Sequence, residues 1–269
     1  MTEQMINLPE GIPPLNQYYF YLTAGCNLAC SHCWLSPAYQ PGGGTGGHLD
    51  FELFKLAIDE GLPLGLQGVK LTGGEPLLHP DFIPMVDLLR EKELNLTVET
   101  NGVLMTSELA NYLKENSSLN HISVSLDGAS AQTHDAFRNV VGSFQKAVQG
   151  IKYLAEAGFQ PQVIMSLHKE NVNEIEALVN LAEKIGAGSV KFNLIQPSGR
   201  GETMTDRGQV LGVERLIEIG KWVETELQSR TSIALLYSWP MAFYTIKRLI
   251  AKDTNTCGIF NILGILSTG

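Results

Sequence analysis

The stretch TAGCNLACSHCW, residues 23–34, decides the fold of this 269-residue chain. It contains Cys26, Cys30 and Cys33 in the order C-x3-C-x2-C. Three thiolates at this spacing can hold three irons of a [4Fe–4S] cluster, which normally takes four cysteines. The fourth iron then stays open for a substrate or cofactor, by the reasoning that separates catalytic from structural zinc sites. The spacing therefore predicts chemistry at an iron rather than storage of electrons.

Composition and charge fit one large α/β domain. Hydrophobic residues make up 44% and charged residues 17% of the chain, which excludes general disorder. The formal net charge of −9 argues against nucleic-acid binding, which needs clustered Lys and Arg. No run approaches the roughly 18 apolar residues of a membrane span, and residues 1–16 lack the features of a signal peptide. We expect a cytoplasmic protein without a membrane partner.

Apolar runs alternate with amphipathic stretches along most of the chain. Six strands are expected, at residues 18–23, 68–71, 95–99, 121–126, 161–167 and 189–195. Each is followed by an expected helix, at residues 51–61, 81–92, 107–116, 144–157, 173–185 and 213–228. Six such units predict parallel strands with right-handed crossovers. Because eight units would close a full barrel, the sequence predicts an α/β fold with a partial (β/α)6 TIM-like barrel.

The expected domain boundaries follow from this pattern. Residues 1–17 form an N-terminal arm, residues 18–230 the partial barrel, and residues 231–269 a linker with the beginning of a C-terminal extension. Active sites of parallel barrels lie at the C-terminal ends of the strands. Every expected strand ends in a polar or glycine-rich motif, namely the cysteine segment (residues 23–34), TGGEP (72–76), ETNG (99–102), SLDG (125–128), SLHKEN (166–171) and IQPSGRG (195–201). Six motifs on one rim of the barrel, one of which contains the three candidate metal-binding cysteines, indicate an active site there.

The chain resembles the radical S-adenosylmethionine (radical SAM) superfamily. The resemblance rests on CNLACSHC (26–33), GGEP (73–76), ETNG (99–102), SLDG (125–128) and THDAFRN (133–139), and it covers about residues 18–200. It implies that Cys26, Cys30 and Cys33 bind a [4Fe–4S] cluster whose open iron chelates the amine and carboxylate of SAM. One electron from this cluster would cleave SAM to methionine and a 5′-deoxyadenosyl radical, which takes a hydrogen atom from the substrate.

The same resemblance assigns the SAM contacts. Gly73 and Gly74 would leave their backbone bare for close approach, and Glu75 would accept hydrogen bonds from the SAM ammonium. The Arg138 guanidinium is a fitting partner for the SAM carboxylate. Ser125 would offer a hydroxyl near the ribose and carboxylate of SAM. Asn101 and Asp127 are further candidates for ribose contacts, and His32 would lie beside the adenine. The family often has Gly after this arginine, whereas this chain has Asn139, which puts the local turn in doubt.

Simpler interpretations stay open from the residues alone. Cys26, Cys30, Cys33 and His32 would bind a structural zinc in a non-catalytic zinc or iron–sulfur protein. Glu75 would be a surface acid before a proline turn.

Arg138 would pair with a surface carboxylate such as Asp135. The polar residues of the other strand-end motifs, namely Asn101, Ser125 and Asp127, would only form turns. We also expect residues 18–21 to be strand core, His168 a solvated loop histidine and Arg200 an exposed loop arginine. No catalytic acid or base on the substrate side is identified.

The fourth cysteine, Cys257, opens the tail CGIFNILGILSTG. This tail resembles the start of the auxiliary-cluster extension called SPASM, with Gly269 where that extension has a glycine. We therefore expect a truncated sequence whose full-length form holds one or two further [4Fe–4S] clusters.

Members of the SPASM-type group modify peptides, proteins or peptide-derived cofactors. The first hypothesis is a maturase that crosslinks or epimerises a ribosomally made peptide. The alternatives are a sulfatase-type protein maturase and a tetrapyrrole-modifying enzyme. The implied partners are a peptide or protein substrate and an external electron donor of the flavodoxin or ferredoxin type. Only 25 residues precede Cys26, too few for a winged-helix leader-peptide domain, so a separate leader-binding protein is a further expected partner.

Overall fold

A computed structural model describes residues 8–251 and 261–269. Its main sheet has eight strands in the order β10-β1-β4-β5-β6-β7-β8-β9, and all neighbouring strands are parallel. The strands are β1 (Gln17–Tyr21), β4 (Gly68–Thr72), β5 (Asn95–Thr100), β6 (Leu119–Ser125), β7 (Gln162–Leu167), β8 (Ser189–Leu194), β9 (Ala234–Tyr237) and β10 (Ile262–Ile265). A second small sheet pairs β2 (Gly25–Cys26) with β3 (Ala38–Tyr39).

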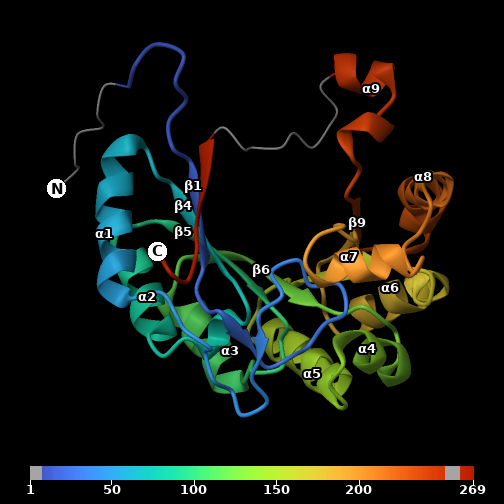
Figure 1. Ribbon diagram of the computed structural model, residues 1–269, viewed down its shortest axis with the longest axis horizontal. Helices are drawn as coiled ribbons and strands as arrows, with labels where there is room; N and C mark the ends of the chain where they lie inside the picture. The colour runs from blue at the N-terminus through green and yellow to red at the C-terminus, as the bar shows by residue number, and fades with distance from the viewer. Residues whose placement is uncertain (1–7, 252–260) are drawn as a thin grey trace.

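Helices α1 (Phe51–Gly61), α2 (Phe82–Glu91), α3 (Ser107–Asn116), α5 (Ser143–Glu156), α6 (Ile175–Lys184) and α8 (Val213–Trp222) lie along the outer side of the curved main sheet (Figure 1). The other helices are α4 (Ala131–Arg138), α7 (Arg200–Asp206) and α9 (Ile246–Ile250). A π-helical turn, Val223–Leu227, continues α8.

Local sequence explains the way these elements pack. The Asp50 side chain caps α1 by accepting from the Leu53 amide at 3.1 Å. Phe54 and Ile58, one helical turn apart, then face the sheet and are fully buried. In β8 the buried side chains are Val190 and Phe192, so the alternate residues face the concave side of the sheet.

The expected partial TIM-like barrel is confirmed, and α1 and α3 have the expected bounds. The sheet also contains β9 and β10, which lie in the segment expected to be a linker. They pair with β8 and β1 at the two edges of the sheet, so the sheet is open among the described residues. Strands of four residues carry too little periodicity to be recognised from sequence. Cys257 lies outside the described residues.

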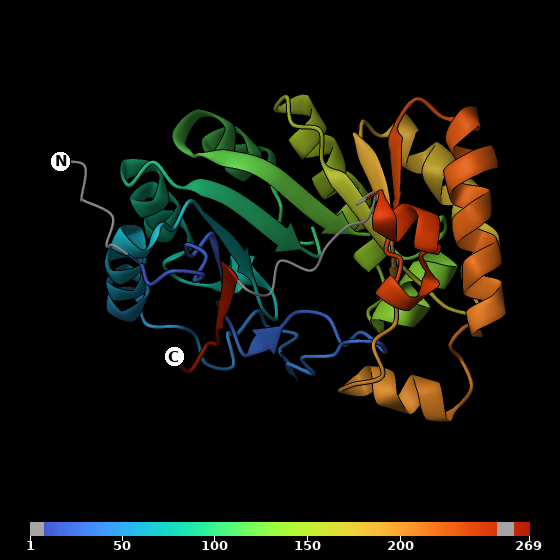
Figure 2. The same ribbon diagram turned by 90° about the horizontal axis from the view of Figure 1, so that it is seen from above.

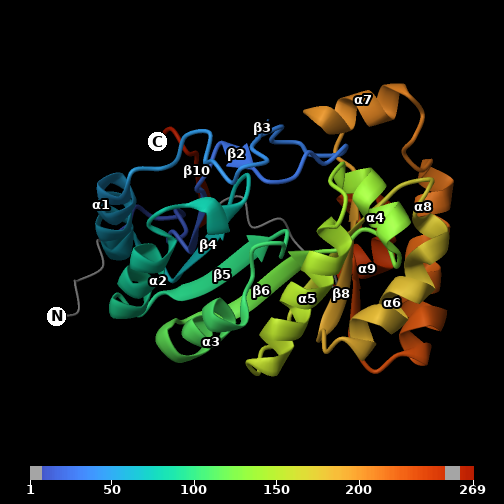
Figure 3. The ribbon, with the colours of Figure 1, turned by 90° about the horizontal axis from the view of Figure 1, so that it is seen from below.

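The loops at the carboxyl ends of the strands pack on one another. The cysteine segment with β2 and β3 lies on the same side of the molecule as α7 (Figures 2 and 3). The Arg200 amide donates to the Cys33 carbonyl at 3.0 Å, and the Glu75 amide to the Gly25 carbonyl at 3.2 Å. In the described part of the chain, no helix has both the length and the apolar character needed to cross a membrane.

Candidate active site

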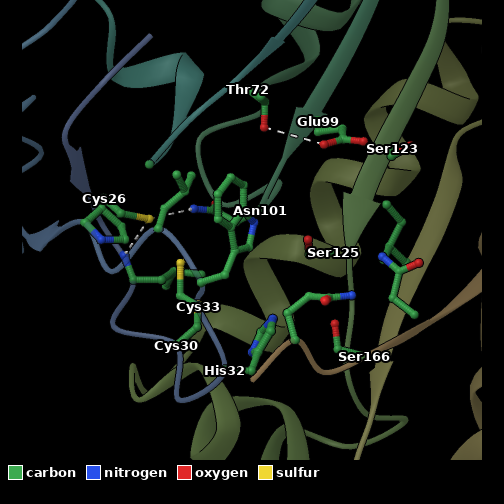
Figure 4. Close-up of a pocket in the computed structure, with 18 of the residues that line it drawn as sticks. Cys26, Cys30, His32, Cys33, Thr72, Glu99, Asn101, Ser123, Ser125 and Ser166 are labelled. Carbon is green, nitrogen blue, oxygen red and sulfur yellow. Dashed lines mark hydrogen bonds between the residues drawn. The ribbon is translucent and has the colours of Figure 1, made fainter. Parts of the chain in front are cut away.

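A cavity of about 740 Å³ lies where the strand-end loops meet. The three cysteines, Glu75 and Arg138 line it. Figure 4 shows the cysteines and His32 on one side, with Thr72, Glu99 and Ser123 on strands at the other. The volume lies in the range of pockets that bind small molecules and cofactors.

The thiols sit in surroundings suited to an iron–sulfur cluster. Cys26 and Cys30 are buried and Cys33 is half-buried. The Leu28 amide donates to the Cys26 sulfur at 3.4 Å, and Arg138 Nη1 donates to the Cys30 sulfur at 3.3 Å. Burial raises the pKa of the Cys26 thiol to about 12. A bound metal cluster would supply the positive charge that holds such buried groups as thiolates, so the donor set fits the group.

The arrangement does not favour a mononuclear zinc site. Among residues 8–251 and 261–269, no three His, Cys, Asp or Glu side chains are grouped to hold one metal ion. A [4Fe–4S] cluster does not need such convergence, because each thiolate ligates a different iron. The His32 ring instead stacks on Phe137, with ring centroids 4.4 Å apart.

Glu75 is fully buried, so its interpretation as a surface acid is wrong. One carboxylate oxygen accepts from the Thr100 hydroxyl at 2.6 Å and from the Leu77 amide at 3.1 Å. The other accepts from the Asn101 amide at 2.8 Å. Burial raises the pKa of Glu75 above its usual range in spite of these bonds. A buried carboxylate bonded to neutral donors favours a cationic ligand such as an ammonium group.

Gly73 and Gly74 allow the GGE segment to pack on the cysteine segment. Gly73 has a φ of +130°, a conformation that L side chains rarely adopt. A Cβ at position 74 would lie 1.8 Å from the Gly25 carbonyl oxygen. Both glycines line the cavity. Their close approach to SAM remains a prediction, but their packing within the chain already requires glycine.

Arg138 forms a buried ion pair with Asp127. Its Nε and Nη2 atoms each lie 2.5 Å from Asp127 Oδ2, while Oδ1 accepts from the Ser166 amide at 2.8 Å. Burial alone would raise the pKa of Asp127, but the Arg138 guanidinium outweighs it and holds that pKa below its usual range. The alternative interpretation, an ion pair between Arg138 and Asp135, is wrong, because Asp135 instead accepts from the Gly142 and Phe144 amides.

Asp127 is fully buried behind Arg138 and is not among the residues that line the cavity. Its geometry therefore supports positioning of Arg138 in place of the expected ribose contact. Ser125 does line the cavity. Asn101 has two local roles: its Oδ1 accepts from the Val103 amide at 2.9 Å, and its Nδ2 donates to Asn27 Oδ1 at 2.7 Å. The ribose contacts of Ser125 and Asn101 remain predictions.

The turn after Arg138 forms without glycine. Asn139 adopts the left-handed conformation with a φ of 55°, which asparagine tolerates better than most residues. Its Nδ2 donates to the Ala29 carbonyl and to the Ser31 hydroxyl, both at 2.9 Å. The residue that put this turn in doubt therefore ties α4 to the cysteine segment.

Two expectations for single loop residues were wrong. His168 is buried and stacks on Phe137, with centroids 4.2 Å apart, rather than being solvated. Arg200 lines the cavity instead of being exposed, because its Nε donates to the Cys30 carbonyl at 2.7 Å and its Nη1 to the Pro37 carbonyl at 3.2 Å. Its Nη2 is buried with no hydrogen-bond partner in the described part of the chain.

The expectation that the aromatic residues of β1 form strand core was only half correct. Tyr18 and Phe20 are buried, whereas Tyr19 and Tyr21 line the cavity, because side chains alternate along a strand. Sequence reasoning also missed Thr23, whose hydroxyl lies 3.1 Å from both the Gly25 and Glu75 carbonyl oxygens. No local sequence signal marks that contact, since 52 positions separate Thr23 from Glu75.

Known proteins resemble this chain over most of its length. An AdoMet-dependent heme synthase of Nitratidesulfovibrio vulgaris is 30% identical over 246 residues, 91% of this chain and 65% of the relative. The mycofactocin maturase MftC of Mycobacterium tuberculosis is 36% identical over 181 residues, 67% of this chain and 44% of the relative. The chain thus spans less than two thirds of the length of these relatives.

A solved structure shares the fold. SuiB of Streptococcus suis, bound to its precursor peptide SuiA, aligns with a TM-score of 0.71 at 16% identity, covering 95% of this chain and 58% of SuiB. The family model that describes the radical SAM superfamily matches residues 20–182. This family implies SAM and a [4Fe–4S] cluster, for which the cysteines and Glu75 provide fitting groups. The chain therefore belongs to the radical SAM superfamily of enzymes.

Proposed function

We propose that this chain uses SAM at a [4Fe–4S] cluster to abstract hydrogen from a peptide, in the maturation of a ribosomal peptide product by crosslinking or epimerisation. The observation that carries the proposal is that Cys26, Cys30, Cys33, Glu75 and Arg138 all line one cavity. When bound, the cluster and SAM supply reductive cleavage of a carbon–sulfur bond and a hydrogen-abstracting radical.

The residues of the chain bind and orient the cofactors. The three cysteines would hold the cluster, and Glu75 would accept from the SAM ammonium. Arg138, oriented by the buried Asp127, would bind the SAM carboxylate.

His32 would lie beside the adenine, where its buried Nδ1 has no hydrogen-bond partner in the described part of the chain. An external flavodoxin or ferredoxin would deliver the electron. Auxiliary clusters and a separate leader-binding protein belong to this proposal for a longer form of the protein.

The similarity to MftC, a maturase, and to SuiB, bound to a precursor peptide, supports a peptide substrate. A tetrapyrrole is the second candidate, favoured by the longer match to an AdoMet-dependent heme synthase, over 91% of the chain. A sulfatase-type protein substrate would require the same cofactor site.

Anaerobic reconstitution with iron and sulfide tests the cofactor chemistry. We expect a coloured protein that releases 5′-deoxyadenosine from SAM when a reductant is added. Cys30→Ala should abolish this release and lower the bound iron while the far-ultraviolet circular dichroism stays unchanged. A zinc-containing, colourless protein, or SAM cleavage retained in the Cys30→Ala variant, would refute the proposal.

Mass spectrometry of candidate substrates separates the two functions. A peptide encoded beside this gene should lose two hydrogens on crosslinking, or gain one deuterium from D₂O on epimerisation. Turnover of a propionate-bearing tetrapyrrole, with the peptide left unchanged, would replace the first candidate by the second.

A further inference from the structure

Arg200, at the start of α7, connects the loop after β8 to the cysteine segment. Its Nε donates to the Cys30 carbonyl at 2.7 Å and its Nη1 to the Pro37 carbonyl at 3.2 Å. The Arg200 amide donates to the Cys33 carbonyl at 3.0 Å. Arg200 therefore contacts the backbone of two of the three cysteines, and it also lines the cavity.

Two glycines beside Arg200 fix this arrangement. Gly199 has a φ of +55°, and a Cβ there would lie 2.3 Å from the Trp34 carbonyl oxygen. A Cβ at Gly201 would lie 3.2 Å from the His32 carbonyl oxygen. The backbone around Arg200 is thus packed directly on the backbone of the cysteine segment. Close packing of this kind keeps the Arg200 side chain next to Cys30.

The positive charge of Arg200 is not neutralised within the described residues. No carboxylate among them lies within ion-pair distance of its guanidinium, and its Nη2 is buried without a hydrogen-bond partner there. The groups that Nε and Nη1 meet are backbone carbonyls, which carry no net charge. Because a guanidinium stays protonated in proteins, a permanent positive charge lies beside Cys30.

Arg138, a second arginine next to Cys30, differs in this respect. Its Nη1 donates to the Cys30 sulfur at 3.3 Å, but its charge is balanced by the buried Asp127 carboxylate. The fields of two opposite charges in contact largely cancel at longer range, whereas the field of a single charge does not. Arg200 therefore supplies the unbalanced positive charge at this cysteine.

We propose that Arg200 raises the reduction potential of the cluster held by Cys26, Cys30 and Cys33. The inference rests on the proposed function, since it takes these cysteines to hold a [4Fe–4S] cluster. Reduction transfers one electron from the external donor to the cluster and forms or breaks no bond, so the cluster with its three thiolates becomes more negative by one charge. An unbalanced cation nearby stabilises that reduced state. Arg200 thus makes the cluster easier to reduce.

A redox titration of the reconstituted, SAM-free protein tests this role, with the reduced cluster followed by electron paramagnetic resonance. Arg200→Gln removes the charge but keeps an amide that can donate to the Cys30 carbonyl. We expect it to lower the ratio of reduced to oxidised cluster at a fixed potential about tenfold, the order of magnitude that Coulomb's law gives for one partly buried charge. This change equals a shift of about 59 mV for a one-electron couple.

Three further variants separate charge from structure. Arg200→Lys keeps the charge and should restore most of the wild-type potential. Arg200→Met, a second neutral variant, should lower the potential as Arg200→Gln does. Arg207→Gln is the matched control, because it removes the same charge from the exposed C-terminal end of α7. Solvent screens that position, so the potential should stay at the wild-type value.

The outcomes distinguish this proposal from the proposed function. If the wild type binds no [4Fe–4S] cluster, the proposed function fails. If the wild type binds the cluster and cleaves SAM, the role of Arg200 alone is refuted by a wild-type potential in both neutral variants, by an equal drop in Arg207→Gln, or by a potential as low in Arg200→Lys as in Arg200→Gln. Failure of both neutral variants to hold a cluster also refutes it, because Arg200 would then only hold the cysteine segment in place.

Discussion

The two walls of the cavity are built differently. The cofactor wall comprises the cysteine segment, residues 73–76, residues 100–102 and Arg138. Its polar groups are tightly bonded within the protein: Glu75 accepts three hydrogen bonds and Arg138 is paired with Asp127. The lumen wall comprises the inward side chains of the strands, such as Thr72, Glu99 and Ser123. There the contacts between polar side chains are mostly longer, as in the 3.5 Å Thr72–Glu99 and 3.4 Å Ser123–Gln162 hydrogen bonds, apart from the 2.8 Å Lys70–Glu99 pair.

The difference shows how one cavity serves two tasks. A cofactor that is the same in every cycle is best held by groups already fixed in place. Variants of the cofactor wall should therefore unfold the protein or empty it of iron, whereas variants of the lumen wall should affect only substrate binding.

The largest effect is expected for Gly74→Ala. The added Cβ would meet the Gly25 carbonyl oxygen at 1.8 Å, so the cysteine segment must move. We expect almost complete loss of iron after reconstitution, measured per protein chain. Gly42→Ala is the matched control, because its Cβ would meet nothing within 4 Å. Wild-type iron content in Gly74→Ala would show that the cofactor wall is not tightly packed.

Asp127→Asn should have the next largest effect. It leaves the Arg138 guanidinium buried without its counter-charge, a change that typically costs about 3–5 kcal/mol. Urea unfolding of the apoprotein measures the loss. Glu218→Gln breaks the exposed Arg215–Glu218 pair of 3.1 Å and should have little effect. Equal losses in the two variants would contradict the proposed support of the cofactor wall.

The free energy of unfolding should depend on pH through His134, whose Nδ1 accepts from the Asp127 amide at 3.1 Å. Burial lowers the pKa of His134 from 6.5 to about 4. Between pH 6.5 and pH 4 the unfolded chain binds a proton at His134 that the folded chain does not bind. The contribution of neutral His134 to stability is therefore complete above pH 6.5 and is lost as the pH falls toward 4. The loss should reach about 3 kcal/mol by pH 4.

Unfolding at several pH values in this window measures the effect. His134→Asn, which keeps an acceptor for the amide, should flatten the profile, whereas His121→Asn at an exposed position should not. A profile unchanged in His134→Asn would assign the pH dependence to other groups.

The smallest effect is expected for the stability of Lys191→Gln. Because Lys191 has no ion-pair partner in the described part of the chain, its removal should leave the free energy of unfolding within about 0.5 kcal/mol of wild type, or raise it. A clear loss of stability would mean that Lys191 supports the fold, and the contrast between the two walls would weaken.

Long periodic segments made most of the barrel predictable. Helix α3 has the expected bounds because Thr106 caps it and the apolar spacing is regular. Strands β9 and β10 were missed because each has four residues and gains its stability from pairing with β8 and β1. Short strands of this kind depend on neighbours that the local sequence does not name.

The candidate site was predictable where its residues form contiguous motifs. The cysteine triad, GGE and Arg138 could be brought together because parallel strands end on one rim. The partner of Arg138 was not predictable, since a surface acid three positions before it and a buried acid 11 positions before it are equally plausible in sequence. The environments of His168 and Arg200 were misjudged for the same reason, because both are set by residues distant in sequence, namely Phe137 and Cys30.

The sequence by itself determined the cofactor chemistry of this protein and the order of its strands and helices, because ligand spacing and hydrophobic periodicity are local properties. Only the tertiary structure decided which charges are neutralised. Asp127 reaches Arg138, Glu99 reaches Lys70, and Lys191 reaches neither carboxylate closely enough to pair. These outcomes depend on distances between groups on different strands, loops and helices, which only the packing of these elements sets.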